Sequence, residues 1–312
     1  MSEHPSAPAS TPATDLGSGP GPDQPPRPPA RIDPPALQRH LGHGGSAWLH
    51  GEVARRMGER VGVVRRTPTR VLDWWSPVSA SQGLLATLYP DATIVPVGFD
   101  GQVLPAAPGR SWWQRWRSAP AGPAGQPAAP AGLLWANMML HWVDDLPAQL
   151  RQWHAAVEVD GFLMFSCFGP DTLLQLRGLY RRLGWGPVGS DWTDMHDLGD
   201  ALVHAGFADP VMDMEQLTLT WDSPEKLLAE LRTLGRNTAP ARHAGLRTPR
   251  WRERLLQALR QELAGPDGRL HLRFELVYGH AFRPVPRVAM QAQTSISLDD
   301  MRQMTRRPAP RP

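Results

Sequence analysis

The clearest pattern of hydrophobic and polar positions lies in residues 132–169. Two apolar runs, at residues 133–135 and Phe162–Phe168, have the length and composition of buried strands. A helix between them is indicated by residues at three- and four-residue spacing: Leu150, Trp153, His154 and Val157. The pair Asp160-Gly161 marks the predicted end of this helix. Strand, helix and strand in this order predict a βαβ unit and therefore a parallel sheet.

The same two periodicities recur along the chain. They predict helices over residues 36–64 (interrupted near residues 42–45), 79–88, 171–183, 193–205, 225–234 and 248–263. They predict further strands over residues 70–75, 93–97, 211–221 and 270–282. This order favours an α/β fold with a Rossmann-like, doubly wound and mostly parallel sheet that ends in antiparallel strands.

Composition divides the chain into a domain and two tails. Proline, alanine, serine and glycine dominate residues 1–35, with almost no aliphatic side chains, so we expect this tail to be disordered. Residues 284–312 are similarly poor in apolar residues and are expected to be flexible. The 312-residue chain then has one domain, residues 36–283, with a helical insertion at about 171–192.

Charge and cysteine content argue against several classes of function. The net charge is only +3, and Trp112, Trp113 and Trp116 beside arginines form one short cluster, so we expect no nucleic-acid partner. The single cysteine, Cys167, gives neither a disulfide nor a zinc site and fits the cytoplasm. We expect no bound metal, no signal peptide and no membrane span, and a monomer is the default expectation.

Ligands of such sheets bind beyond the carboxyl ends of the strands. One strand end carries Asn137, Met138 and His141. Asp73 lies near the end of the first predicted strand, residues 70–75, and a helix is predicted from Ser79. This arrangement of strand, turn and helix is typical of sites for nucleotide-like cofactors, whose charged groups bind at helix N-termini.

From Trp48 to Phe282 the sequence resembles class I S-adenosylmethionine-dependent methyltransferases, and within them the malonyl-acyl-carrier-protein O-methyltransferases of biotin synthesis. The matching segments are residues 49–57, 136–150, 168–177, 192–213, 223–235 and 268–282. The same segments resemble a complex I assembly factor family, an arginine hydroxylase on the same fold. The Asn-aliphatic-His-Trp motif at residues 137–142 carries much of the likeness.

The resemblance implies a set of cofactor contacts, although the sequence departs from the family pattern there. The family's first strand ends in Asp-x-Gly-x-Gly-x-Gly, whereas Asp73 is followed by Trp-Trp-Ser-Pro-Val-Ser-Ala. The acidic residue that binds the ribose corresponds to Gly98, with Asp100 two residues further on. The expected S-adenosylmethionine contacts are Asp73, Trp74, Ser76, Asp100, Asn137 and Met138.

The resemblance also implies methylation of a malonyl-type carboxylate on acyl-carrier protein, or of a small carboxylate substrate. The expected substrate contacts are His141, Arg177, Arg181 and Arg232, because arginine forks bind carboxylates. The basic residues at 250–260 suit an acidic carrier protein. The loss of the glycines leaves two alternatives: a non-catalytic protein that keeps the fold and binds a partner, and the arginine hydroxylase.

Overall fold

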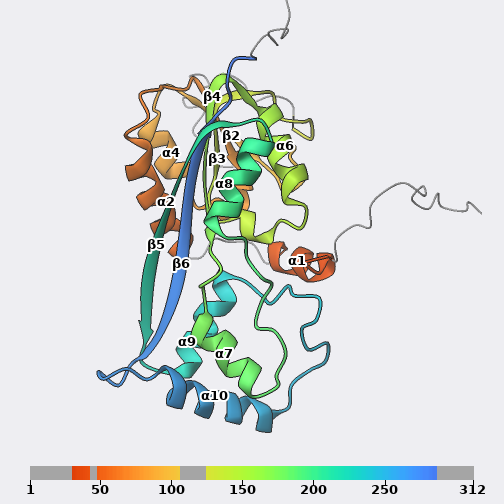
Figure 1. The fold of residues 1–312 in the computed structure, drawn as a ribbon, viewed down its shortest axis with the longest axis vertical. Coiled ribbons are helices and arrows are strands. Elements are labelled where there is room, and N and C mark those ends of the chain that lie inside the picture. The colour runs from red at the N-terminus through yellow and green to blue at the C-terminus, as the bar shows by residue number, and fades with distance from the viewer. Residues whose placement is uncertain (1–29, 43–47, 106–123, 287–312) are drawn as a thin grey trace, which may run out of the picture.

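The computed structural model describes residues 30–42, 48–105 and 124–286. Its sheet has six strands in the spatial order β2-β1-β3-β4-β6-β5 (Figure 1). The strands are β1 (Arg70–Trp74), β2 (Thr93–Val97), β3 (Ala131–Ala136), β4 (Val157–Phe168), β5 (Ala208–Trp221) and β6 (Leu270–Phe282). The first four are parallel to one another, whereas β6 is antiparallel to both β4 and β5. The doubly wound, mostly parallel sheet predicted from the sequence is confirmed.

Helices cover both faces of the sheet (Figure 1). On one face lie α2 (Trp48–Val61) and α4 (Gln82–Leu88), and on the other lie α6 (Leu146–Ala156) and α8 (Met195–His204). Alternation along β3 explains both cores: Leu133 and Trp135 pack under α2, whereas Leu134 and Ala136 pack toward α6. Both faces are therefore apolar, as expected for a parallel sheet covered on two sides.

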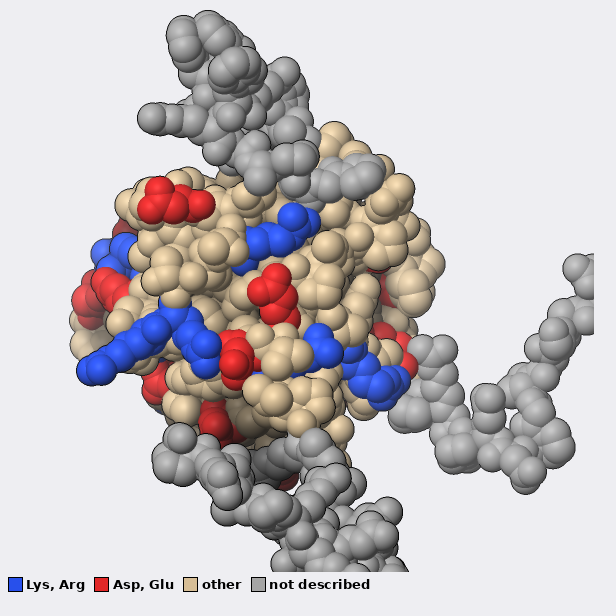
Figure 2. Space-filling view, turned by 90° about the horizontal axis from the view of Figure 1, so that it is seen from above, with Lys and Arg blue, Asp and Glu red and all other residues tan. Residues whose placement is uncertain are grey.

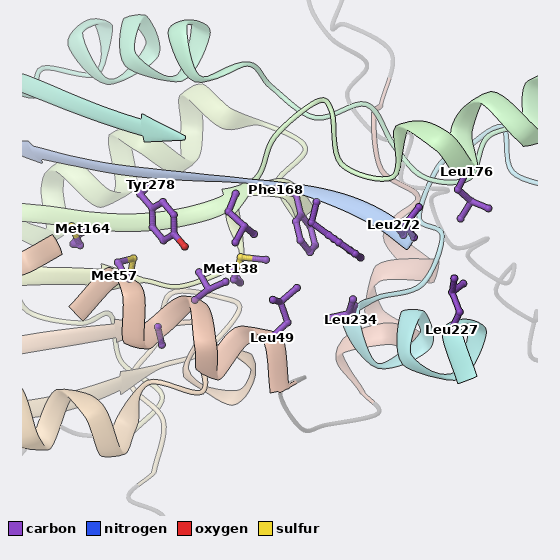
Figure 3. Packing of buried hydrophobic residues seen from close by; sticks show 14 of the residues in the cluster. Leu49, Met57, Met138, Met164, Phe168, Leu176, Leu227, Leu234, Leu272 and Tyr278 are labelled. Carbon is purple, nitrogen blue, oxygen red and sulfur yellow. The ribbon is translucent and has the colours of Figure 1, made fainter. Parts of the chain in front are cut away.

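A second, smaller lobe of helices lies beyond the carboxyl ends of the parallel strands (Figure 1). It contains α7 (Leu174–Arg182), α9 (Pro224–Leu234) and α10 (Pro249–Leu263), and the long strands β5 and β6 extend into it. Figure 3 shows that the apolar core is continuous between the lobes, with Phe168 between Leu49 on one side and Leu234 on the other. The lobe therefore packs on the edge of the sheet where a ligand of this fold is expected.

The remaining elements are short. They are α1 (Pro34–Leu41), α3 (Ser76–Ser79) and η1 (Leu140–Trp142). Ordered contacts begin before residue 36: Ile32 is buried, and the Asp33 side chain accepts a hydrogen bond from the backbone N–H of Ala36 and caps α1. The three tryptophans at 112, 113 and 116 lie outside the described residues.

One local prediction was wrong. Asp160-Gly161 does not end α6, which stops at Ala156, but lies within β4. Asp160 adopts a left-handed conformation (φ 64°), and the register between β3 and β4 shifts between Ala131 and Leu133. The Asp-Gly pair therefore marks an irregularity in a strand, a conformation that the same residue types also favour.

Figure 2 views the molecule from the end opposite the helical lobe. Basic and acidic side chains are interspersed there, without a large area of one sign. A groove of about 840 Å³ at this end is lined by residues of both signs, including Arg65, Arg66, Asp160 and Asp209. No helix of the described ranges is long and apolar enough to cross a membrane.

Candidate functional site

The turn after β1 keeps a left-handed backbone although it has lost the family's glycines. Trp75 has φ 57° and ψ 42°, and Ala80 has φ 53°, so both occupy a region that L-residues adopt at a cost. Between them α3 makes a single turn, with Pro77 in its first turn. Trp75 and Ala80 therefore adopt a backbone conformation that glycine favours, although both carry side chains.

Asp73 lies at the carboxyl end of β1 and is fully buried. Its Oδ2 accepts a hydrogen bond from the Ser76 hydroxyl at 2.6 Å, while its Oδ1 has no partner among the described residues. Burial raises the pKa of this carboxyl from 3.8 to about 6, partly offset by the bond from Ser76. Near neutral pH this edge of the sheet therefore holds a buried negative charge that has no cationic partner among the described residues.

The side chain of Asn137 is held on all sides by protein groups. Its Nδ2 donates to the carbonyl oxygens of His50 (2.8 Å) and Ser79 (2.6 Å), and its Oδ1 accepts from the Ser166 hydroxyl (2.7 Å). These partners belong to α2, the turn after β1, and β4. Asn137 therefore ties together the elements that surround the strand ends, and its amide is fully occupied by these contacts.

Aromatic rings fill the space beyond the ends of β1 and β2. The Trp75 indole is 5% exposed and stacks on Trp142, with ring centroids 6.4 Å apart and planes at 19°. The Phe99 ring meets Trp75 edge-on at 4.9 Å. Trp142 also contacts the rings of His40 and His141, both at 4.5 Å. This aromatic stack forms a boundary between the turn after β1 and the helical lobe.

Several buried polar atoms along this edge have no hydrogen-bond partner in the described structure. They are Asp73 Oδ1, Trp74 Nε1, Trp75 Nε1, His50 Nε2 and His141 Nε2. Native interiors contain few such atoms, and each costs about 1–3 kcal/mol when it stays unpaired. Five of them at one sheet edge therefore indicate a position for a polar ligand.

The hydrogen bonds of the two histidines define which of these atoms donate. His50 Nδ1 lies 2.7 Å from the Val78 carbonyl oxygen, so Nδ1 carries the proton and Nε2 is an acceptor. His141 Nδ1 accepts from the backbone N–H of Phe168 at 3.5 Å, so its Nε2 carries the proton and is a donor. Burial lowers the pKa of both rings, that of His141 well below its usual value, so both are neutral at pH 7.

A cavity of about 630 Å³ lies between the strand ends and the helical lobe. Its buried end includes His141, Trp142 and Phe168, and the rest of its wall includes leucines and aromatic rings from α7, α9, α10 and β6. Caps and prolines fix the helices: Ser223 accepts from the Lys226 N–H before Pro224, and Thr248 accepts from the Trp251 N–H before Pro249.

All charged side chains that line this cavity are arginines. They are Arg232, Arg236, Arg247 and Arg252. The guanidinium of Arg247 donates to the Trp185 carbonyl oxygen at 2.7 Å and lies over the Trp251 ring. Arg232 and Arg252 are exposed, and their side chains form no hydrogen bond or ion pair within the described ranges. The cavity is therefore an apolar chamber with a cationic, solvent-facing side, suited to an anion with an apolar body.

The other predicted substrate residues lie elsewhere in the lobe. Arg177 is held by Asp191 (3.1 Å) and the Ser190 carbonyl oxygen (2.7 Å) and lies over the Trp192 ring. Arg181 is exposed on α7. Neither belongs to the wall of the cavity, whereas Arg232 and His141 do. The structure thus brings two of the four predicted substrate residues to one chamber.

The predicted cofactor residues lie at the carboxyl edge, but in different settings. Trp74 is buried and Met138 has a left-handed backbone (φ 52°) with its N–H bonded to Ser166. Asp100 lies on the exposed turn after β2, where its Oδ1 accepts from the Gln102 N–H at 3.0 Å. Sequence reasoning did not single out His50, which reaches the site from α2. It named Arg252 as part of a basic face for an acidic carrier protein and not as part of this cavity.

Cys167 lies in β4 and is 2% exposed. Burial raises the pKa of its thiol to about 12, so the thiolate is not formed near neutral pH. Cys167 is therefore a buried core residue and not a candidate nucleophile. Within the described ranges, no group of three or more histidine, cysteine or acidic residues is arranged to hold a metal ion.

Comparison with known proteins identifies the family. A malonyl-[acyl-carrier protein] O-methyltransferase of Gallionella capsiferriformans is 38% identical over 257 residues, 79% of this chain and 88% of that protein. One of Laribacter hongkongensis is 37% identical over 257 residues, covering 78% of this chain and 85% of that protein. The chain belongs to the malonyl-[acyl-carrier protein] O-methyltransferase family. The resemblance described from the sequence is confirmed, and with it the assignment as a methyltransferase.

No family model matches the chain. Among solved structures, the YcgJ protein from Bacillus subtilis aligns over 74% of this chain and 99% of its own length, with a TM-score of 0.46 and 11% identity.

The residues at the strand ends suit the cofactor of such methyltransferases, S-adenosylmethionine. This molecule carries an ammonium and a sulfonium, and the unpartnered Asp73 Oδ1 is a buried anionic acceptor. The free donors of Trp74 and His141 and the free acceptor of His50 complement its carboxylate and hydroxyl groups. This edge of the sheet therefore offers both hydrogen-bond donors and acceptors. The aromatic stack of Trp75 and Trp142 occupies part of the same region.

Proposed function

We propose that this chain is an S-adenosylmethionine-dependent methyltransferase that esterifies a malonyl-type carboxylate on acyl-carrier protein, in the cytoplasm and in biotin synthesis. Family membership supports the reaction type. The main structural support is the position of Trp142 between the strand ends and the cavity. Its ring stacks on Trp75 and also lines the cavity that contains the arginines. The arginine hydroxylase and the non-catalytic protein are not favoured by the family membership.

The chemistry requires little from the side chains. S-adenosylmethionine, when bound, supplies a methyl group that its sulfonium already activates. The acceptor carboxylate is ionised at neutral pH and needs no general base. We therefore assign His141 a hydrogen-bonding role, since its imidazole is neutral and its Nδ1 is occupied.

The main contributions of the protein are then alignment and exclusion of water. Proximity and orientation supply up to about 7–11 kcal/mol in such reactions. Asp73 would hold the cationic part of the cofactor, and the buried ring of His141 would face the acceptor side. Asn137 fixes the backbone of α2 and of the turn after β1 around them. The buried aromatic rings exclude water from this junction.

Two measurements on the full-length protein test the proposal. S-adenosylmethionine should give a saturable heat in a calorimetric titration. Its binding should also raise the melting temperature of the protein. Incubation with S-adenosylmethionine and malonyl-acyl-carrier protein should add one methyl group to the acyl chain, detected by mass spectrometry. If millimolar cofactor gives no heat and no change in melting temperature, the enzymatic function is refuted. Cofactor binding without transfer to the malonyl group would refute the substrate.

A further inference from the structure

The cavity beside the strand ends has two chemically different ends. Its inner end consists of His141, Trp142 and Phe168, all less than 9% exposed. Arg232 and Arg252, by contrast, are exposed on α9 and α10. Because Trp142 also stacks on Trp75 after β1, the inner end of the cavity adjoins the strand ends. The two exposed arginines lie on the side of the cavity wall that faces solvent.

The acceptor carboxylate of the proposed reaction must come close to the strand ends, where the cofactor is expected. The inner end offers a neutral donor, His141 Nε2–H, which has no partner in the described structure. A three-carbon acyl group fills only a small part of about 630 Å³. Arg232 and Arg252 line another part of the same cavity, so a longer group attached to the acyl chain can lie beside them.

The arginines on this side have free hydrogen-bonding capacity. Neither the Arg232 nor the Arg252 side chain has a hydrogen bond or an ion pair within the described residues, and the residues that line the wall there include no acidic side chain. Arg247 is already bonded to the Trp185 carbonyl oxygen. Two exposed guanidinium groups in the wall of one apolar chamber match a phosphate, which accepts several charge-assisted hydrogen bonds.

We propose that Arg232 and Arg252 bind the phosphate of the phosphopantetheine arm of the carrier protein, while the acceptor carboxylate lies at the inner end beside His141. This inference rests on the proposed function. It assigns the two arginines to the arm that delivers the substrate and not to the reacting carboxylate, the role that the sequence suggested for Arg232. It also gives the cavity a direction, with the acyl group inward and the carrier protein outside α9 and α10.

Three malonyl thioesters distinguish the possible roles of the arginines: malonyl-acyl-carrier protein, malonyl-phosphopantetheine and malonyl-pantetheine, which lacks the phosphate. The variant Arg232→Gln/Arg252→Gln should raise KM roughly tenfold or more for the first two and leave the third unchanged, since charge-assisted bonds are lost only where a phosphate is present. Arg151→Gln, which replaces an exposed arginine of α6 outside the cavity wall, is the matched control and should change none of them.

The other outcomes overturn the inference. A loss with all three thioesters would place the arginines on the acceptor carboxylate. A loss only with the carrier protein would place them on its acidic surface, and no loss would remove them from substrate binding.

A binding measurement decides the same question without methyl transfer. Wild-type protein should bind carrier protein with its arm more tightly than carrier protein without it, and the double variant should lose this difference. Equal affinity of the wild type for both forms would refute the inference. Absence of methyl transfer by the wild type to any thioester would instead refute the proposed function, and the binding result would still decide the role of the arginines.

Discussion

The indole of Trp75 stacks on the indole of Trp142, with ring centroids 6.4 Å apart and planes inclined by 19°. Trp75 belongs to the turn after β1, where the family has glycine, and Trp142 belongs to η1 and lines the cavity of the helical lobe. The stack therefore connects the strand ends to the substrate side. It also occupies space that the glycines of relatives would leave open.

Replacement of Trp75 by glycine tests this interpretation. Loss of a buried indole costs about 3–5 kcal/mol, and relief of the left-handed backbone recovers about 1–2 kcal/mol. We expect a net destabilisation of about 2–3 kcal/mol and tighter S-adenosylmethionine binding, because a stack that competes with the ligand is removed. Denaturant unfolding and calorimetric titration measure the two effects.

Ala80→Gly is the matched control for the backbone contribution. Ala80 shares the left-handed conformation (φ 53°) but carries no ring. This variant should be more stable by about 1 kcal/mol with unchanged cofactor affinity. Weaker cofactor binding by Trp75→Gly would show that the indole contacts the cofactor and does not compete with it.

Asp73→Asn should separate stability from binding. Because burial raises the pKa of Asp73 from 3.8 in the unfolded chain to about 6, its contribution to stability is greatest below pH 4 and is lost as the pH rises to 6. The free energy of unfolding of the variant should therefore equal that of the wild type near pH 4 and exceed it by about 3 kcal/mol at pH 7. Unfolding curves at both pH values measure this difference. A variant less stable than the wild type at pH 7 would contradict the assignment.

Cofactor affinity should follow the ionisation of Asp73. The carboxylate is charged above pH 6 and attracts the cationic cofactor, so the dissociation constant should fall as the pH rises from 5 to 7. Burial lowers the pKa of His50 and His141, so both rings are neutral at the pH 7 end of this range. Calorimetric titrations at pH 5, 6 and 7 provide the test. In Asp73→Asn, binding should be weak and independent of pH, and a retained pH dependence would assign the effect to another group.

Asn137→Ala should destabilise the protein by about 2–4 kcal/mol, because it leaves the carbonyl oxygens of His50 and Ser79 and the Ser166 hydroxyl without this partner. Asn137→Asp should be worse, since a carboxylate would face two carbonyl oxygens. Denaturant unfolding measures both. Ser166→Ala, which removes one of the three bonds, is the control and should cost less. Unchanged stability in Asn137→Ala would show that the three hydrogen bonds contribute little.

The sequence determined the type and order of most elements, because burial on both faces of a parallel sheet requires apolar runs that are visible locally. β2 and β6 have their predicted bounds, and the caps at Ser223 and Thr248 begin α9 and α10. The Asp160-Gly161 pair could not be interpreted correctly, since turn residues favour a strand irregularity as much as a helix end. For this reason, the sequence predicts the ends of the helices less well than their existence and order.

The site itself depended on tertiary structure. Asn137 finds its partners 87, 58 and 29 residues away, so no local pattern predicts that its amide is fully occupied. The sequence showed that tryptophan replaces glycine after Asp73, but only the fold shows that Trp75 keeps the left-handed backbone and stacks on Trp142. Spacing along the chain determines which face a side chain occupies; contacts between distant segments determine what that side chain meets.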